Sequence, residues 1–115
     1  MLPDDGALLL DMLIAARRAA KYAEGVSRED FNADPLLQDG IVHQIQIVGE
    51  AAGRITEELR DAHPEIPWRR VIGMRHWLVH GYRNLDLDRV WDTAQNWLPP
   101  LIAALELLVP PEEDL

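Results

Sequence analysis

The chain has 115 residues, 48% of them apolar, and a net charge of −9, which predicts one domain with a substantial core. It contains no cysteine, so disulfides, thiolate metal ligands and a catalytic thiol are excluded. The acidic balance argues against diffuse binding to nucleic acid, because such binding grows with the number of phosphates neutralised. Any contact with RNA is therefore expected at one focused cleft.

Neither an export signal nor a membrane span is expected. The first residues are acidic where a signal peptide is basic, and the apolar runs are interrupted every few residues. We therefore expect a cytoplasmic protein that does not contact membranes. A single domain over residues 1–115 is predicted, with a flexible acidic tail over residues 110–115.

Helical periodicity runs through almost the whole chain. Gly25 is expected to end the first helix, and Ser27 predicts a short capped turn with Asp30 as its acidic third residue. A long amphipathic helix is predicted from Asp34, the N-cap before a proline, to about Leu59. The first helix has an apolar stripe formed by Leu9, Met12, Leu13, Ala16, Ala19 and Ala20.

Two further helices complete the predicted fold. The third is expected from Pro67 to about Gly81, and the fourth begins near residues 86–88 and continues to about Leu108. The pair Pro99–Pro100 should kink or restart the fourth helix, because proline lacks a backbone donor. No strand alternation is apparent. The predicted fold class is therefore all-α, an antiparallel bundle of four or five helices.

The segment from Arg75 to Tyr82 holds the strongest candidates for chemistry. No carboxylate lies between Glu65 and Asp86. A histidine held among fixed cations suits chemistry on a phosphodiester, because it can move protons while the cations hold the anion. The arginines of this interval are Arg69, Arg70, Arg75 and Arg83.

Arg75 also has a purely structural interpretation. On the predicted third helix it falls in one stripe with Trp68 and Ile72. An arginine there would have to reach a partner, a ligand or the edge of an interface, because an unpaired buried charge is strongly destabilising. A salt bridge to Glu50 on the long helix would satisfy it.

His80 lies five residues after Arg75, about 140° around an ideal helix, so the two do not share a face of one straight helix. Either Gly81 ends the helix and lets His80 turn back, or two copies of the motif meet across a dimer axis. His76 and His80 would share a face, as helical metal ligands do. No third ligand is evident, so no metal or other cofactor is expected. A structural role is the alternative for a lone helical histidine.

The aromatic residues also allow two interpretations. Tyr82 is either a packed ring with its hydroxyl hydrogen-bonded or an exposed hydroxyl that a partner enzyme modifies, and the spacing does not choose between them. Large rings at helical spacing usually pack, so a core or a dimer interface is expected for Trp68, Trp77, Trp91 and Trp97.

The pattern Arg75-x4-His80-x-Tyr82 resembles the Arg-x4-His-x-Tyr motif of the HepT-like toxins in the HEPN superfamily. The likeness spans about Leu8 to Leu108. His76 stands where relatives carry a polar residue, often asparagine, and Arg83 stands where an aromatic is frequent. The surrounding segments that match are Gln38–Gly40, Ile47–Ala52, Ile66–Arg69, Ile72–Arg75, Val79–Tyr82 and Asp86–Trp91.

This resemblance implies an all-helical homodimer whose motifs face one another, and a metal-independent endoribonuclease toxin of a type VII toxin–antitoxin system. It also implies a partner, an MntA-like minimal nucleotidyltransferase that neutralises the toxin by attaching AMP to Tyr82. The substrate class is RNA, either tRNA or mRNA. The alternatives are a non-catalytic HEPN dimer that binds a nucleotide or scaffolds the transferase, and a plain structural dimer.

The hypothesis gives each candidate residue a role. His80 acts as the general acid or base, and Arg75 holds the non-bridging phosphate oxygens. His76 supports one of these roles, and Glu50 could support Arg75. The expected products are a 2′,3′-cyclic phosphate and a 5′-hydroxyl. The residues expected to steer the RNA backbone are Arg69, Arg70 and Arg83.

Overall fold

The computed structural model describes residues 3–80 and 84–110 of the chain, and these residues form an all-α bundle with one short hairpin. Its helices are α1 (Pro3–Ala23), α2 (Arg28–Asn32), α3 (Pro35–Arg54), α4 (Glu57–Ala62), α5 (Trp68–Trp77), α6 (Leu87–Asp92) and α7 (Leu98–Leu108). A π-helical turn, η1 (Thr93–Trp97), joins α6 to α7. Strands β1 (Val79–His80) and β2 (Asn84–Leu85) pair antiparallel. Of the tail predicted over residues 110–115, residues 111–115 lie outside the described residues.

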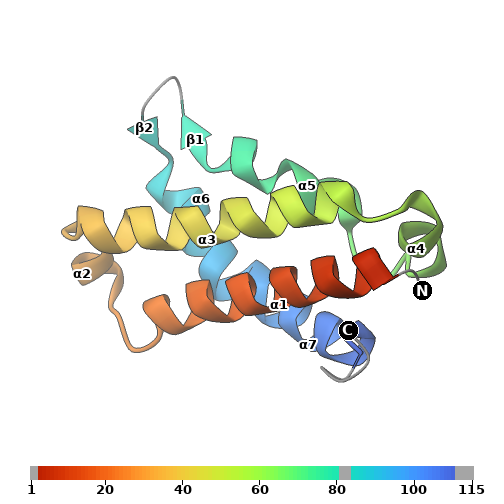
Figure 1. Ribbon diagram of the computed structural model, residues 1–115. Coiled ribbons are helices and arrows are strands. Elements are labelled where there is room, and N and C mark those ends of the chain that lie inside the picture. The colour runs from red at the N-terminus through yellow and green to blue at the C-terminus, as the bar shows by residue number, and fades with distance from the viewer. Residues whose placement is uncertain (1–2, 81–83, 111–115) are drawn as a thin grey trace.

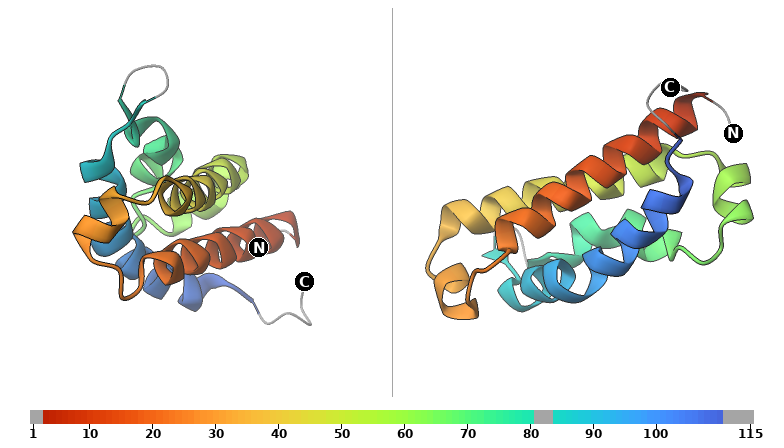
Figure 2. Two further views of the ribbon diagram at one scale, coloured as in Figure 1. Left: turned by 90° about the vertical axis from the view of Figure 1, so that its left-hand side faces the viewer. Right: turned by 90° about the horizontal axis from the view of Figure 1, so that it is seen from below.

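The bundle is made from four antiparallel segments. Helices α1 and α3 lie side by side, and α5 runs back along α3 (Figure 1). The continuous run of α6, η1 and α7 then returns along α1 (Figure 2). The β1–β2 hairpin projects from the bundle where α5 turns into α6 (Figure 1). This arrangement confirms the predicted all-α fold.

The first half of the chain follows its local sequence signals. Gly25 has a φ of 73°, a conformation that favours glycine, just after α1 ends. The hydroxyl of Ser27 accepts a hydrogen bond from the Asp30 N–H and caps α2. Asp34 caps α3 through the Leu37 N–H, with Pro35 at the first helical position. These starts and stops confirm the predictions.

The long predicted helix is wrong at its C-terminal end. Helix α3 ends at Arg54, the next residue Ile55 is extended, and Thr56 caps a separate helix α4 through the Leu59 N–H. The apolar spacing continues across this break because Ile55 and Leu59 are buried in the same core as α3. Periodicity alone therefore could not place the break.

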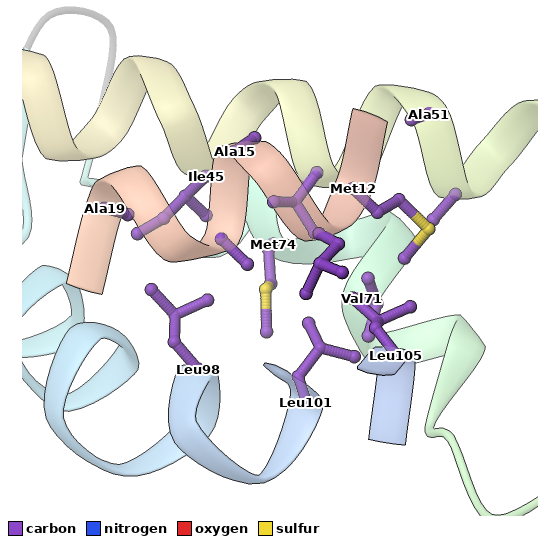
Figure 3. Close-up of a cluster of buried hydrophobic side chains, with 14 of the residues drawn as sticks. Met12, Ala15, Ala19, Ile45, Ala51, Val71, Met74, Leu98, Leu101 and Leu105 are labelled. Atoms are coloured by element: carbon purple, nitrogen blue, oxygen red, sulfur yellow. The ribbon is translucent and has the colours of Figure 1, made fainter. Parts of the chain in front are cut away.

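Four elements supply the core in Figure 3, where side chains from α1, α3, α5 and α7 converge. Helices α3 and α5 approach closely at Gly49. A Cβ there would lie 3.1 Å from the Val71 carbonyl oxygen and 3.3 Å from that of Ile72. The residues labelled in the figure are Met12, Ala15, Ala19, Ile45, Ala51, Val71, Met74, Leu98, Leu101 and Leu105.

A kink or restart was predicted at Pro99–Pro100, but α6, η1 and α7 follow one another without a break, and the helix changes type just before the prolines. Pro99 and Pro100 occupy the first turn of α7, where missing backbone donors are tolerated. The preceding turn widens to the π form, and the Leu98 N–H bonds to the Thr93 carbonyl. Asp86 caps α6 through the Arg89 N–H, which confirms the predicted start. No helix within residues 3–80 and 84–110 is long and apolar enough to cross a membrane.

Candidate functional site

The predicted motif begins in the last turn of α5 and continues into the hairpin. Arg75 and His76 are both exposed on α5. Leu78 is fully buried and anchors the chain between the helix and β1. The backbone of His80 lies in β1 and pairs with Asn84. The chain therefore passes from the exposed Arg75 at the end of α5, through the buried Leu78, to His80 in β1.

Helix α5 ends four residues before the predicted stop at Gly81. Trp77 is its last residue and Leu78 its C-cap. The carbonyl oxygens of Trp77 and Leu78 accept hydrogen bonds from Arg89 of α6 and from its N-cap Asp86, and not from later residues of α5. Gly81, Tyr82 and Arg83 lie outside the described residues, so the predictions for Tyr82 and Arg83 stay predictions.

This early stop corrects two expectations about His80. Because β1 is extended, the 140° helical separation from Arg75 does not apply. His76 lies on α5 and the backbone of His80 lies in β1, so the two do not share a helical face as the spacing suggested. Among the residues that the structure describes, no group of three or more histidine, aspartate or glutamate side chains could hold a metal ion.

The structural interpretation of Arg75, a buried side chain paired with Glu50, does not hold within the described residues. The buried face of α5 is formed by Trp68, Val71 and Met74. It shares Trp68 with the predicted stripe, but Val71 and Met74 are buried in place of Ile72 and Arg75. Glu50 is exposed on α3, and no ion pair joins it to Arg75 within the described part of the chain. The guanidinium of Arg75 is therefore presented to solvent from the end of α5.

The neighbouring arginines differ from one another. Arg69 is exposed and lines an open cleft of 690 Å³ between α4 and α5, which also contains Arg60 and the carboxylates of Glu57 and Asp61. Arg70 is half-buried. Of the two, Arg69 is the more accessible to a ligand.

Arg70 stacks against two indoles. Its guanidinium carbon lies 4.0 Å from the ring centroid of Trp77 and 4.4 Å from that of Trp97. Contacts of this kind hold a guanidinium without a carboxylate partner. Trp68 is buried, and Trp77, Trp91 and Trp97 pack against the core, which confirms that the tryptophans pack.

Sequence reasoning missed Arg89 of α6. Its guanidinium carbon lies 3.7 Å from the Trp77 ring centroid, and its Nη1 donates to the Trp77 carbonyl oxygen at 3.2 Å. Its Nε lies 3.4 Å from Oδ2 of Asp86. Asp86 and Arg89 are three residues apart at the start of α6, a spacing from which an ion pair could have been predicted. The contact with Trp77, twelve residues away, had no local signal.

Asp86 is the first carboxylate after the cationic segment, and this ion pair offsets its charge. Its Oδ1 also accepts the N–H of Arg89. Asp86 Oδ1 therefore accepts a hydrogen bond from Arg89, and Oδ2 is ion-paired with the guanidinium of the same residue. Asp86 is consequently less repulsive to an anion at the end of α5 than an unpaired carboxylate would be.

Taken together, the fold and site define an all-α bundle with an exposed arginine and histidine directly before a histidine-bearing hairpin. The chain belongs to the HepT-like family, described as "Ribonuclease HepT-like", whose model matches residues 12–108. This match confirms the resemblance found in the sequence.

Two relatives illustrate the similarity. "Probable ribonuclease HepT" of Thermococcus cleftensis is 32% identical over 100 residues, covering 87% of this chain and 91% of the relative. "Putative RNase TTE0752" of Caldanaerobacter subterraneus subsp. tengcongensis is 36% identical over 78 residues, covering 68% and 70% respectively. No solved structure matches the chain significantly.

Proposed function

We propose that this protein is a metal-independent endoribonuclease, and that it acts as the toxin of a type VII toxin–antitoxin system. The observation that carries this proposal is the family match across residues 12–108, which includes the whole Arg75–His80 segment. The ribonuclease names of the two relatives support the same reaction class. The substrate is RNA, either tRNA or mRNA.

The proposed chemistry uses the nucleophile that RNA itself carries. His80 removes the proton of the ribose 2′-hydroxyl or protonates the leaving 5′-oxygen, because an imidazole can do either near neutrality. Arg75 holds the non-bridging oxygens with its planar fork of donors. The attack forms a 2′,3′-cyclic phosphate and breaks the bond to the 5′-oxygen. The exposure of Arg75 and His76 supports access by a substrate backbone.

The remaining cations bind the strand in this proposal. Arg69, and Arg83 outside the described residues, steer the RNA backbone, and His76 supports the phosphate contact. Arg70 adds positive charge, although its stacking between Trp77 and Trp97 favours a mainly packing role. Glu50 could orient Arg75 only after a rearrangement, since no ion pair joins them among the described residues.

The catalytic unit is proposed to be a homodimer in which two Arg75–His80 segments face one cleft. One His80 then serves as base and its counterpart in the partner subunit as acid. The net charge of −9 supports a focused cleft over a diffuse RNA-binding surface. Light scattering of the purified protein measures the assembly directly.

His80→Ala tests the proposal. The wild-type protein should cleave RNA in the presence of EDTA and leave cyclic phosphate ends. The variant should lose about 10²–10⁴-fold in rate, the usual contribution of a general acid or base. Its helical circular dichroism and its dimerisation should be unchanged. Full cleavage by the variant would remove His80 from the mechanism, and a strict metal requirement would contradict the scheme.

The same experiment separates the non-catalytic alternative. A dimer that only binds a nucleotide or scaffolds a transferase would not cleave RNA in any form. It would also not arrest growth on expression through the motif residues. Growth arrest that is lost in both His80→Ala and Arg75→Ala would support the toxin.

A further inference from the structure

The end of α5 is held by residues of the α6 N-terminus. The Trp77 carbonyl oxygen accepts a hydrogen bond from Nη1 of Arg89 at 3.2 Å. The Leu78 carbonyl oxygen accepts one from the Asp86 N–H at 2.8 Å. The last carbonyls of a helix lack partners within the helix. Here two successive carbonyls obtain their donors from one neighbouring helix start.

The planar guanidinium group of Arg89 makes three kinds of contact. It lies over the Trp77 ring at 3.7 Å, donates to the carbonyl of the same residue, and pairs through Nε with Asp86. A guanidinium can stack and donate in its plane at once, whereas a lysine ammonium is a single point charge. The site is therefore specific for arginine and not only for positive charge.

The contacts of Arg89 with Trp77 and Asp86 form a clamp at the end of α5. Trp77 links this clamp to the candidate site. It follows Arg75 by two residues and precedes His80 by three. Arg70 contacts the same indole from within α5 at 4.0 Å. The β1–β2 pairing begins with Val79 opposite Leu85, directly after the clamped residues. A change in where α5 ends would alter the path from Arg75 to His80, because each added helical residue turns the chain by about 100°.

We propose that Arg89 is a positioning residue for RNA cleavage: by holding Trp77 at the end of α5 it sets the placement of His80 relative to Arg75. This inference rests on the proposed ribonuclease function. Arg89 acts through the backbone of Trp77 and needs no contact with the substrate.

A simpler role for Arg89 is to add a positive charge to an RNA-binding surface, since 41% of its side chain is exposed. The two roles predict different results for Arg89→Lys. A lysine keeps the charge, so it would preserve an electrostatic role. It cannot stack and donate in one plane, so it would not preserve the clamp.

Arg28→Lys is the matched control. Arg28 also contacts α6 residues, pairing with Asp88 and lying 5.9 Å from the Trp91 ring centroid. It extends from α2, where it also donates to Asn32. The control therefore makes the same chemical change at an arginine–tryptophan contact that does not hold the end of α5.

The experiment measures steady-state RNA cleavage and amide hydrogen exchange on the full-length variants. For Arg89→Lys, kcat should fall at least about tenfold, since small misplacements of catalytic groups cost this much or more. KM for RNA should stay within about twofold, because the charge is retained. Exchange at the Asp86 amide, which bonds to Leu78, should accelerate about tenfold as this local structure opens more often. Arg28→Lys should match the wild type in all three quantities.

Two results would overturn the inference. One is wild-type kcat and exchange in Arg89→Lys. The other is a raised KM with unchanged exchange, which would identify an electrostatic contact with RNA. If the wild type cleaves no RNA, the proposed function and the catalytic consequence both fail. The exchange result would then still decide whether Arg89 holds the end of α5, so the two failures are distinguishable.

Discussion

Both carboxylate oxygens of Asp5 accept hydrogen bonds from Thr56, Oδ1 from the backbone N–H at 3.0 Å and Oδ2 from the hydroxyl at 2.6 Å. Asp5 is only 2% exposed. The contact joins the first turn of α1 to the N-cap residue of α4, just after the end of α3. It thus joins two parts of the bundle that are 51 residues apart.

Asp5→Ala should destabilise the fold by about 1–3 kcal/mol, because Thr56 loses its charged acceptor in a buried setting. Urea unfolding followed by circular dichroism measures this. Asp4→Ala is the control, since Asp4 is exposed in the same helical turn and shares the same favourable position near the helix N-terminus. Equal losses in the two variants would show that the Thr56 contact contributes nothing.

Gly49→Ala should destabilise the protein by about 1–3 kcal/mol through overpacking, because the new methyl group meets two backbone carbonyls of α5. Gly53→Ala, one turn later on α3, should instead be neutral or stabilising by up to about 1 kcal/mol. Its nearest neighbour would be the Ile72 Cγ2 at an ordinary 3.8 Å. Thermal unfolding of both variants checks the contrast. A gain in stability in Gly49→Ala would show that α5 can shift at no net cost.

Arg75→Ala should reduce RNA cleavage by about 10²–10³-fold, the range seen when a group that stabilises transition-state charge is removed. Its unfolding free energy should change by less than about 0.5 kcal/mol, because the side chain is exposed. Arg18→Ala, exposed on α1, is the control for loss of one positive charge. A large loss of stability with little loss of cleavage would assign Arg75 to the fold.

Tyr82 should carry AMP when the protein is produced together with a minimal nucleotidyltransferase encoded beside it. The added phosphate places bulk and negative charge where RNA must bind, so the modified protein should not cleave. Peptide mass spectrometry maps the site, and Tyr82→Phe should remain unmodified. Modification of Tyr22 instead, or of no tyrosine, would contradict the proposal.

The helix starts could be read from the sequence because their signals are local. Ser27, Asp34 and Asp86 each place a side-chain acceptor three residues before a free N–H, and each caps the predicted helix. The change of helix type just before Pro99 is local in the same sense. These features depend on neighbours within one turn of the chain.

The candidate site was less predictable because its shape depends on contacts between distant residues. The carbonyls at the end of α5 accept hydrogen bonds from Arg89 and Asp86, which lie beyond the hairpin. The apolar stripe through Arg75 was plausible by spacing, yet the bundle buries the adjacent stripe that contains Val71 and Met74. The choice between two overlapping stripes is made by packing against α3 and α7 and not by α5 itself.

The clamp at Trp77 has a consequence for protein synthesis. Arg75 and His80 leave the ribosome before Arg89 does, so the nascent motif lacks the donor that closes the end of α5. A product truncated between the hairpin and α6 would carry every motif residue without that contact. Such a fragment would also lack α6, η1 and α7, whose buried residues Leu98, Leu101 and Leu105 complete the core, so the site can assemble only in a chain that contains these elements.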